Sequence, residues 1–221
     1  MIHPVQTETF ALPAVNRREI LRYAGTKAET PELTALLEET LSEALPVLTG
    51  RVCWMEFPLM QHENLLHLGF AATDSVALRR NLAGCDRIVV FAATVGLGLD
   101  RLIARYGHVS PAKALLLQAI GAERIEALCD VFCDKIRLDT GLAAAPRFSP
   151  GYGDFPLELQ RDIFRVLDCP RKIGLTLNES LLMSPSKSVT AILGLGPCAG
   201  SDHSTGCSRC SKTDCIHRRI L

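Results

Sequence analysis

The order in which apolar runs and amphipathic segments follow one another constrains the fold more than any other feature of this sequence. Residues 51–57, 65–70, 87–93, 173–177 and 188–195 are predicted to be strands, and residues 33–48, 74–84, 99–106, 111–138 and 154–167 to be helices. Strands and helices are mixed, but they do not alternate strictly as in a doubly wound parallel sheet. The sequence therefore predicts an α+β body with a largely antiparallel sheet.

Composition excludes several classes of partner. The chain has 221 residues, 48% of them hydrophobic, and its 24 basic residues balance its 24 acidic ones. No net charge attracts it to nucleic acid or to an anionic membrane surface. No apolar run reaches the roughly 20 residues that span a bilayer, and residues 1–8 do not resemble a signal peptide. We expect a cytoplasmic protein whose nine cysteines are free thiols rather than a disulfide framework.

A change of composition near Gly194 divides the globular body from a Cys-rich C-terminal tail at residues 196–221. Cys198, Cys207, Cys210 and Cys215 lie on a segment too polar to bury them in a core. Four such thiolates are predicted to hold a structural zinc ion or an iron–sulfur cluster, and free thiols in a loose tail are the alternative. Cys129 and Cys133, one helical turn apart, are instead expected to be small core residues.

The most unusual segment of the body is the loop Arg147-Phe148-Ser149-Pro150-Gly151-Tyr152-Gly153. Pro150 stiffens the loop, Gly151 lets the backbone approach a ligand, Arg147 offers a planar fork for a carboxylate, and Tyr152 offers a ring with a hydroxyl. Such a loop suits a charged small molecule, although a rigid surface connection has the same composition.

The helix before this loop has an acidic flank. Glu123, Glu126 and Asp130 follow one another at spacings of three and four residues, so their carboxylates share a face. This flank is either simply solvated or lines a cleft beside Arg147, where a ligand's ammonium or sulfonium group would offset the like charges.

Two generic motifs are incomplete. The loop Thr94–Gly98 joins a buried strand to a helix, as in anion-binding turns, but Arg101 stands where a dinucleotide fingerprint needs its third glycine. A plain tight turn is the favoured interpretation. The serines of residues 180–188 have no histidine nearby in sequence, which argues against a serine hydrolase.

Taken together, three blocks resemble the activation domain of cobalamin-dependent methionine synthase. They are the loop Arg147–Tyr152, the acidic helix before it, and the later pattern from Gly174 to Val189, in the same order and with similar spacing over about residues 120–194. The whole body is similar to stand-alone proteins related to that domain. The resemblance implies a curved, mainly antiparallel sheet with flanking helices, built from an N-terminal helix and hairpin portion, residues 1–84, and an activation-domain-like portion, residues 85–195.

The resemblance also implies a ligand and a task. It implies binding of S-adenosylmethionine, with contacts from Arg147, Pro150, Gly151, Tyr152 and the helix acid Glu126. It implies that cobalamin oxidised to Co(II) on a partner is returned to service with one electron from a reductase, flavodoxin-like or other, and a methyl group from S-adenosylmethionine. The sequence shows no catalytic or cobalamin-binding module, so we expect an accessory component that acts on a separate corrinoid methyltransferase.

Two other functions compete with this one. In the first, the tail carries an iron–sulfur cluster and the protein is an electron-transfer activator of corrinoid proteins. In the second, the chain is a metal-stabilised interaction module without catalysis. Retention of Arg147, Gly151 and Tyr152 together argues against the second.

Overall fold

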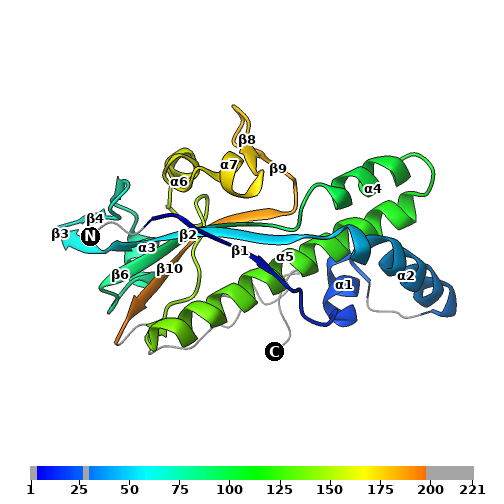
Figure 1. Ribbon diagram of the computed structural model, residues 1–221, viewed down its shortest axis with the longest axis horizontal. Coiled ribbons are helices and arrows are strands. Elements are labelled where there is room, and N and C mark those ends of the chain that lie inside the picture. The colour runs from blue at the N-terminus through cyan, green and yellow to red at the C-terminus, as the bar shows by residue number, and fades with distance from the viewer. Residues whose placement is uncertain (1–3, 27–29, 198–221) are drawn as a thin grey trace.

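A five-stranded antiparallel sheet in the order β1-β2-β6-β10-β7 forms the centre of the computed structural model, which describes residues 4–26 and 30–197 (Figure 1). Its strands are β1 (Gln6–Phe10), β2 (Gly50–Pro58), β6 (Arg87–Thr94), β7 (Ala143–Ala144) and β10 (Ser188–Gly196). Every neighbouring pair of these strands is antiparallel. Strand β6 is buried from Ile88 to Thr94, as expected for the middle of a sheet that is covered on both faces.

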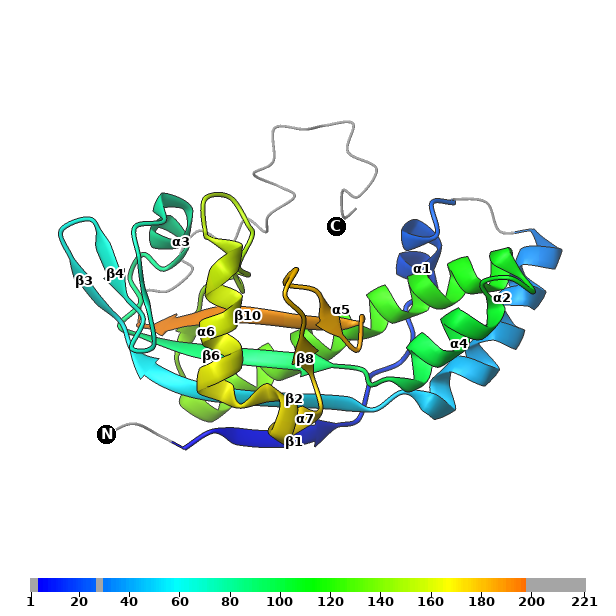
Figure 2. The ribbon, with the colours of Figure 1, turned by 90° about the horizontal axis from the view of Figure 1, so that it is seen from above.

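Helices cover the two faces of the sheet (Figures 1 and 2). The long α5 (Pro111–Thr140) crosses one face, and α1 (Arg17–Tyr23) packs against α5 beyond the strands, whereas α6 (Gln160–Leu167) and α7 (Cys169–Ile173) cover the other face. At one end, α2 (Pro31–Ala44) and α4 (Gly98–Tyr106) pack against α5. The sheet thus separates two cores, one on the α5 side and one on the α6 side.

The alternation of β2 shows how the sequence fills both cores. Val52 and Trp54 belong to the core on the α5 side, and Cys53 and Met55 belong to the opposite core. Successive side chains of a strand point to opposite faces, so one apolar run serves two layers.

The remaining elements are short. They are α3 (Val76–Asn81), the strands β3 (Met60–His62), β4 (Leu65–His67), β5 (Ala72–Thr73), β8 (Thr176–Leu177) and β9 (Met183–Ser184), and the 3₁₀ turns η1 (Leu45–Val47) and η2 (Leu157–Leu159). Strands β3, β4 and β5 form a small sheet of their own, and β8 pairs with β9. No helix among the described residues is both long and apolar enough to cross a membrane.

The predicted fold class, α+β with a curved and mainly antiparallel sheet, is confirmed. Two local predictions are wrong. Residues 173–177 were expected to be a strand, but Pro170 starts the short helix α7 and Gly174, at φ +69°, ends it, so only Thr176–Leu177 pairs. The helix predicted over residues 154–167 begins only at Gln160, and the carboxylate of Asp154 bonds to the start of α3.

Candidate functional site

Strand β10 fixes the start of the arginine loop. Ala145 donates its N–H to the carbonyl of Gly194 at 2.9 Å, and Phe148 and Ile192 exchange backbone hydrogen bonds of 2.9 and 2.8 Å. Residues 145–148 therefore run along the edge of the sheet. The alternation of an extended chain then directs Arg147 toward α5 and Phe148 toward the opposite face.

The guanidinium of Arg147 lies between two carboxylates of α5. It donates to Glu126 through Nη2 and to Asp130 through Nη1, and these two acids stand one helical turn apart. The Arg147 side chain is only 20% exposed, against 33% for Glu126 and 53% for Asp130. Burial opposes the charge of Arg147, but the negative groups of α5 outweigh it and raise its pKa. The arginine is therefore a fixed cation at the edge of the sheet.

A tight turn holds the rest of the loop. Gly151, at φ +86°, donates its N–H to the carbonyl of Phe155 at 2.8 Å, and Tyr152 donates to Ser149 at 3.1 Å. The ring of Tyr152 packs edge-on against Phe148 with centroids 5.7 Å apart, yet the residue is 68% exposed. The loop thus presents an aromatic ring, packed on Phe148, with most of its surface open to solvent.

Asp154 anchors the loop to a distant helix. Its carboxylate accepts hydrogen bonds from the Ser75 hydroxyl at 2.5 Å and from the N–H groups of Val76 and Ala77 at 2.8 and 3.0 Å. These bonds hold the pKa of Asp154 below its usual value, the Ser75 hydroxyl contributing most. The acid serves the first turn of α3, where N–H groups lack partners within the helix.

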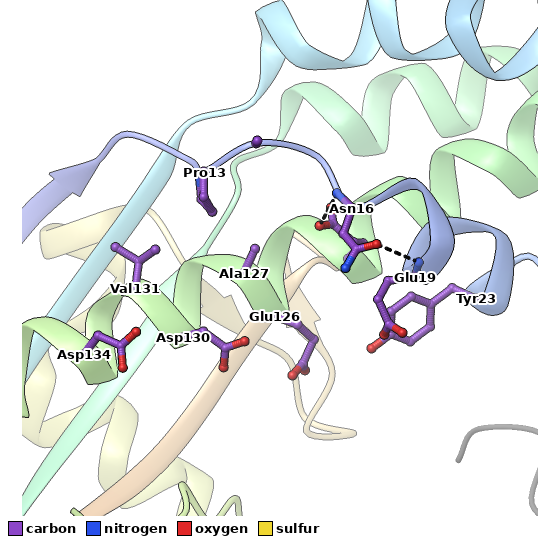
Figure 3. A pocket seen from close by; sticks show the side chains of 11 residues that line it. Pro13, Asn16, Glu19, Tyr23, Glu126, Ala127, Asp130, Val131 and Asp134 are labelled. Atoms are coloured by element: carbon purple, nitrogen blue, oxygen red, sulfur yellow. Dashed lines mark hydrogen bonds between the residues drawn. The ribbon is translucent and has the colours of Figure 1, made fainter. Parts of the chain in front are cut away.

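An acidic pocket of about 390 Å³ adjoins the arginine pair. Figure 3 shows Glu126, Asp130 and Asp134 spaced along one side of α5, with Glu19 and Tyr23 reaching over from α1. The lining residues are Pro13, Ala14, Asn16, Glu19, Tyr23, Glu123, Glu126, Ala127, Asp130, Val131 and Asp134. The carboxylates of this set are paired with Arg22, Arg124, Arg137 and Arg147, which leaves the pocket wall with a small excess of negative charge.

A second arginine of α5 builds the N-terminal wall of this pocket. Arg124 is 1% exposed and donates to the carbonyls of Pro13 and Ala14 and to Glu123. Glu123 in turn accepts the backbone N–H of Asn16 at 3.1 Å, and Asn16 caps α1 by accepting from Glu19 N at 3.2 Å. We call this arrangement the Glu123–Arg124 clamp. It positions the helix that carries Glu19 and Tyr23.

The structure brings some of the predicted site residues together and separates others. Arg147 meets Glu126, as the shared acidic face suggested. Glu123, predicted on the same face, is only 5% exposed and is held by Arg124. Pro150, Gly151 and Tyr152 follow Arg147 in the loop but are not among the residues that line the acidic pocket.

Sequence reasoning missed the N-terminal wall. Glu19 and Tyr23 lie about a hundred residues before the acidic helix, and spacing alone does not join such distant segments. One local signal was available, because Asn16 followed three residues later by Glu19 is a helix-start pattern.

The two cysteines of α5 lie beneath this site. Cys129 and Cys133 are buried, as predicted for small core residues. Burial raises the pKa of the Cys133 thiol to about 11, although the nearby charge of Arg147 works in the opposite direction. A thiol in this state is a poor nucleophile at neutral pH.

The other candidate motifs are resolved differently. Gly96, at φ +88°, donates its N–H to the Thr94 hydroxyl, which fits the tight-turn interpretation of that loop. Within residues 4–26 and 30–197, no group of His, Cys, Asp and Glu side chains is arranged to hold a metal ion. The predicted ligands Cys198, Cys207, Cys210 and Cys215 lie outside the described residues, so the metal site in the tail stays a prediction.

Fold and site together define a class of α+β domains in which a curved antiparallel sheet sets an arginine loop against an acidic helix. The family model described as "Vitamin B12 dependent methionine synthase, activation domain" matches residues 60–204, more than half of the chain. The chain belongs to this family. The suspected resemblance is thereby confirmed.

A solved structure shares the fold. It is described as the MetH reactivation domain bound to AdoHcy, is 18% identical in sequence and superposes with a TM-score of 0.67. The match covers 89% of this chain and 80% of that one. No curated protein matches the chain.

Proposed function

We propose that this protein binds S-adenosylmethionine where the arginine loop meets the acidic face of α5, and that it supports reductive reactivation of a cobalamin-dependent methyltransferase. The observation that carries the proposal is the guanidinium of Arg147 held between Glu126 and Asp130 beside an acidic pocket. Membership in the activation-domain family supports the task, and the AdoHcy-bound structure of the same fold supports the class of ligand.

The charges at the site complement such a ligand. Glu126, Asp130 and Arg147 together carry one net negative charge, and S-adenosylmethionine carries one net positive charge from its ammonium, sulfonium and carboxylate groups. A guanidinium has five N–H donors, and the two ion pairs use one donor on each terminal nitrogen. Arg147 can therefore receive the ligand carboxylate while the acids face its cationic groups.

The N-terminal wall supplies a further acid. Glu19 lines the same pocket as Glu126 and Asp130 but comes from α1, so the pocket has carboxylates on two sides. We propose that Glu19 takes part in holding the ligand's ammonium group. Tyr152, with its exposed ring, would cover an aromatic or sulfonium portion of the ligand.

The contribution of this chain to the reaction is positioning. The reduced corrinoid supplies the nucleophile and the sulfonium supplies the methyl group, so the cofactors carry the chemistry. Arg147 and the acids of α5 would fix the orientation of the methyl donor, which raises its effective concentration at the reacting centre. None of these side chains needs to transfer a proton.

We further propose that the protein acts in trans, in the cytoplasm, on a separate corrinoid methyltransferase, with a flavodoxin-like or other reductase as the source of the electron. Reconstitution tests this directly. A Co(II) corrinoid enzyme, a reductant and methyl-labelled S-adenosylmethionine are expected to yield labelled methylcobalamin only when this protein is added. Equal labelling without it would refute the proposal.

The four tail cysteines carry a separate proposal of bound zinc or an iron–sulfur cluster. Elemental analysis of anaerobically purified protein is expected to show about one zinc ion per chain, or iron with visible absorption for a cluster. Metal-free protein in both assays would leave the tail without this role.

A further inference from the structure

Arg51 occupies a distinctive position near the start of β2. It lies in register with Thr94 of β6, and its side chain shares the α6 and α7 face of the sheet with Cys53, two residues along the strand. Its guanidinium lies against Gly174, the residue that ends α7. A Cβ atom at Gly174 would come 3.7 Å from Nη2 and 4.0 Å from Nη1 of Arg51, so the missing side chain leaves room beside the fork.

The guanidinium of Arg51 has no hydrogen-bond acceptor among the described residues. Its Nε is buried without a partner. Nη1 and Nη2 are not buried in this way and take part in none of the side-chain hydrogen bonds found in residues 4–26 and 30–197, so they are open to solvent. The Nε of Arg51 is thus buried, whereas its two terminal nitrogens keep some contact with solvent next to Gly174.

Several other buried or partly buried cations among the described residues are paired with acids, although the half-buried Lys187 makes no ion pair. Arg124 and Arg147 each meet carboxylates, and Lys113 bonds to both Glu39 and Glu43. A buried donor without an acceptor destabilises a folded protein, so packing alone does not account for Arg51.

The neighbouring hydroxyls do not serve Arg51. Ser188 and Thr94, which lie in register with Arg51 across the sheet, are hydrogen-bonded to each other at 2.9 Å. The Ser188 oxygen also lies 2.8 Å from the carbonyl of Pro185, and Thr94 accepts from Gly96 N at 3.1 Å. On this face of the sheet, the guanidinium of Arg51 is therefore flanked by two hydroxyls that already have hydrogen-bond partners.

We propose that Arg51 is a binding residue for an oxyanion, a carboxylate or phosphate group carried by a small molecule. A guanidinium fork matches either group with two parallel hydrogen bonds. The site lies on the opposite face of the sheet from Arg147, which points to α5, so it is distinct from the S-adenosylmethionine site and does not depend on it.

Thermal unfolding of the full-length protein tests the proposal with inorganic phosphate and acetate as probes, at constant ionic strength. Phosphate, acetate or both are expected to raise the Tm of the wild type in a saturable manner, because a ligand that binds only the folded state stabilises it. Arg51→Met is expected to abolish this rise. Without ligand the same variant is expected to be more stable by about 2–4 °C, since it removes an unsatisfied donor and keeps the packing of the stem.

Arg101→Met is the matched control, because Arg101 is an exposed arginine on α4. It is expected to keep the wild-type response to both anions. If Arg51→Met does not fold, the Nε–H resonance of Arg51 in the wild type replaces the variant and is expected to shift on titration. An equal Tm rise in wild type and Arg51→Met, an unmoved Nε–H resonance, or no response to either anion would overturn the proposal. A response to phosphate alone or acetate alone identifies which oxyanion the fork receives.

Discussion

Two arginines that pair with acids of α5, one on the helix itself and one on the loop after it, show that similar ion pairs can have different roles. Arg124 is buried, and Glu123 and two backbone carbonyls accept its hydrogen bonds. Arg147 also meets carboxylates of α5, but it is 20% exposed and adjoins an open pocket. The first is satisfied by the protein itself and holds the N-terminal segment in place, whereas the second keeps donors that a ligand can use. Burial and the number of internal acceptors distinguish the two.

The largest effect is expected from breaking the Glu123–Arg124 clamp. Arg124→Met leaves Glu123 buried without its partner and frees the carbonyls of Pro13 and Ala14. Removing one member of a buried pair costs about 3–5 kcal/mol, which corresponds to a fall in Tm on the order of 10 °C in a chain of this size. Calorimetry measures this. The double variant Glu123→Gln/Arg124→Met should recover part of the loss, and an unchanged Tm in the single variant would contradict the structural role.

Arg147→Ala is expected to weaken ligand binding with little effect on stability. Its affinity for S-adenosylmethionine in titration calorimetry is expected to fall at least tenfold, about 1.4 kcal/mol, because a charge-assisted hydrogen bond disappears. Stability should change by only about 1 kcal/mol, because the two acids left behind, Glu126 and Asp130, remain in contact with solvent. Arg165→Ala is the control, since Arg165 pairs with Asp162 on α6, on the other face of the sheet. Equal affinities for Arg147→Ala and wild type would remove Arg147 from the site.

A comparison of two ligands sharpens the role of the acids. Glu126→Gln is expected to weaken S-adenosylmethionine more than S-adenosylhomocysteine, which lacks the sulfonium charge. The difference should be roughly fivefold, about 1 kcal/mol for a partly screened charge pair. Competition binding with both ligands measures it. Parallel losses would mean that Glu126 acts only by holding Arg147.

The smallest effect is expected at Asp154, which connects the loop to α3 from a fully exposed position. Its pKa is lower in the folded protein than in the unfolded chain, so its stabilising effect is present above the ordinary value of about 4 and is lost as the pH falls through the lower, folded value. Asp154→Asn should therefore lower Tm slightly at neutral pH, and the difference from wild type should vanish in acid. A difference independent of pH would assign the effect to geometry rather than charge.

The sequence predicted the main strands and helices of this fold better than the contacts between distant segments. The buried run of β6 and the apolar stripe of α5 identified the sheet and the helix, because burial imposes a period on the residues that provide it. The contact of Arg147 with the acidic flank was one of the two alternatives left open by the sequence, and the structure shows it. The bonds of Asp154 to α3 were not predicted, because a residue that caps a helix need not be close to it in sequence.

The N-terminal wall could not have been predicted in the same way. Asn16 and Glu123 are 107 residues apart, and Arg124 and Pro13 are 111 apart, and no periodicity connects them. Pro170 and Gly174 are typical of the start and end of a helix, but residues 173–177 were predicted to be a strand. Long-range polar contacts and short helices were thus the features that needed coordinates.

The Glu123–Arg124 clamp joins residues that are far apart in sequence, and this separation bears on how the chain folds during synthesis. Residues 13–16 leave the ribosome long before α5, and contacts between such distant segments must first overcome the entropy of closing a long loop. The acidic pocket is therefore completed late, after the helix that forms its floor. A nascent chain that stops before residue 124 would contain residues 13–16 but not Arg124, which binds the carbonyls of Pro13 and Ala14.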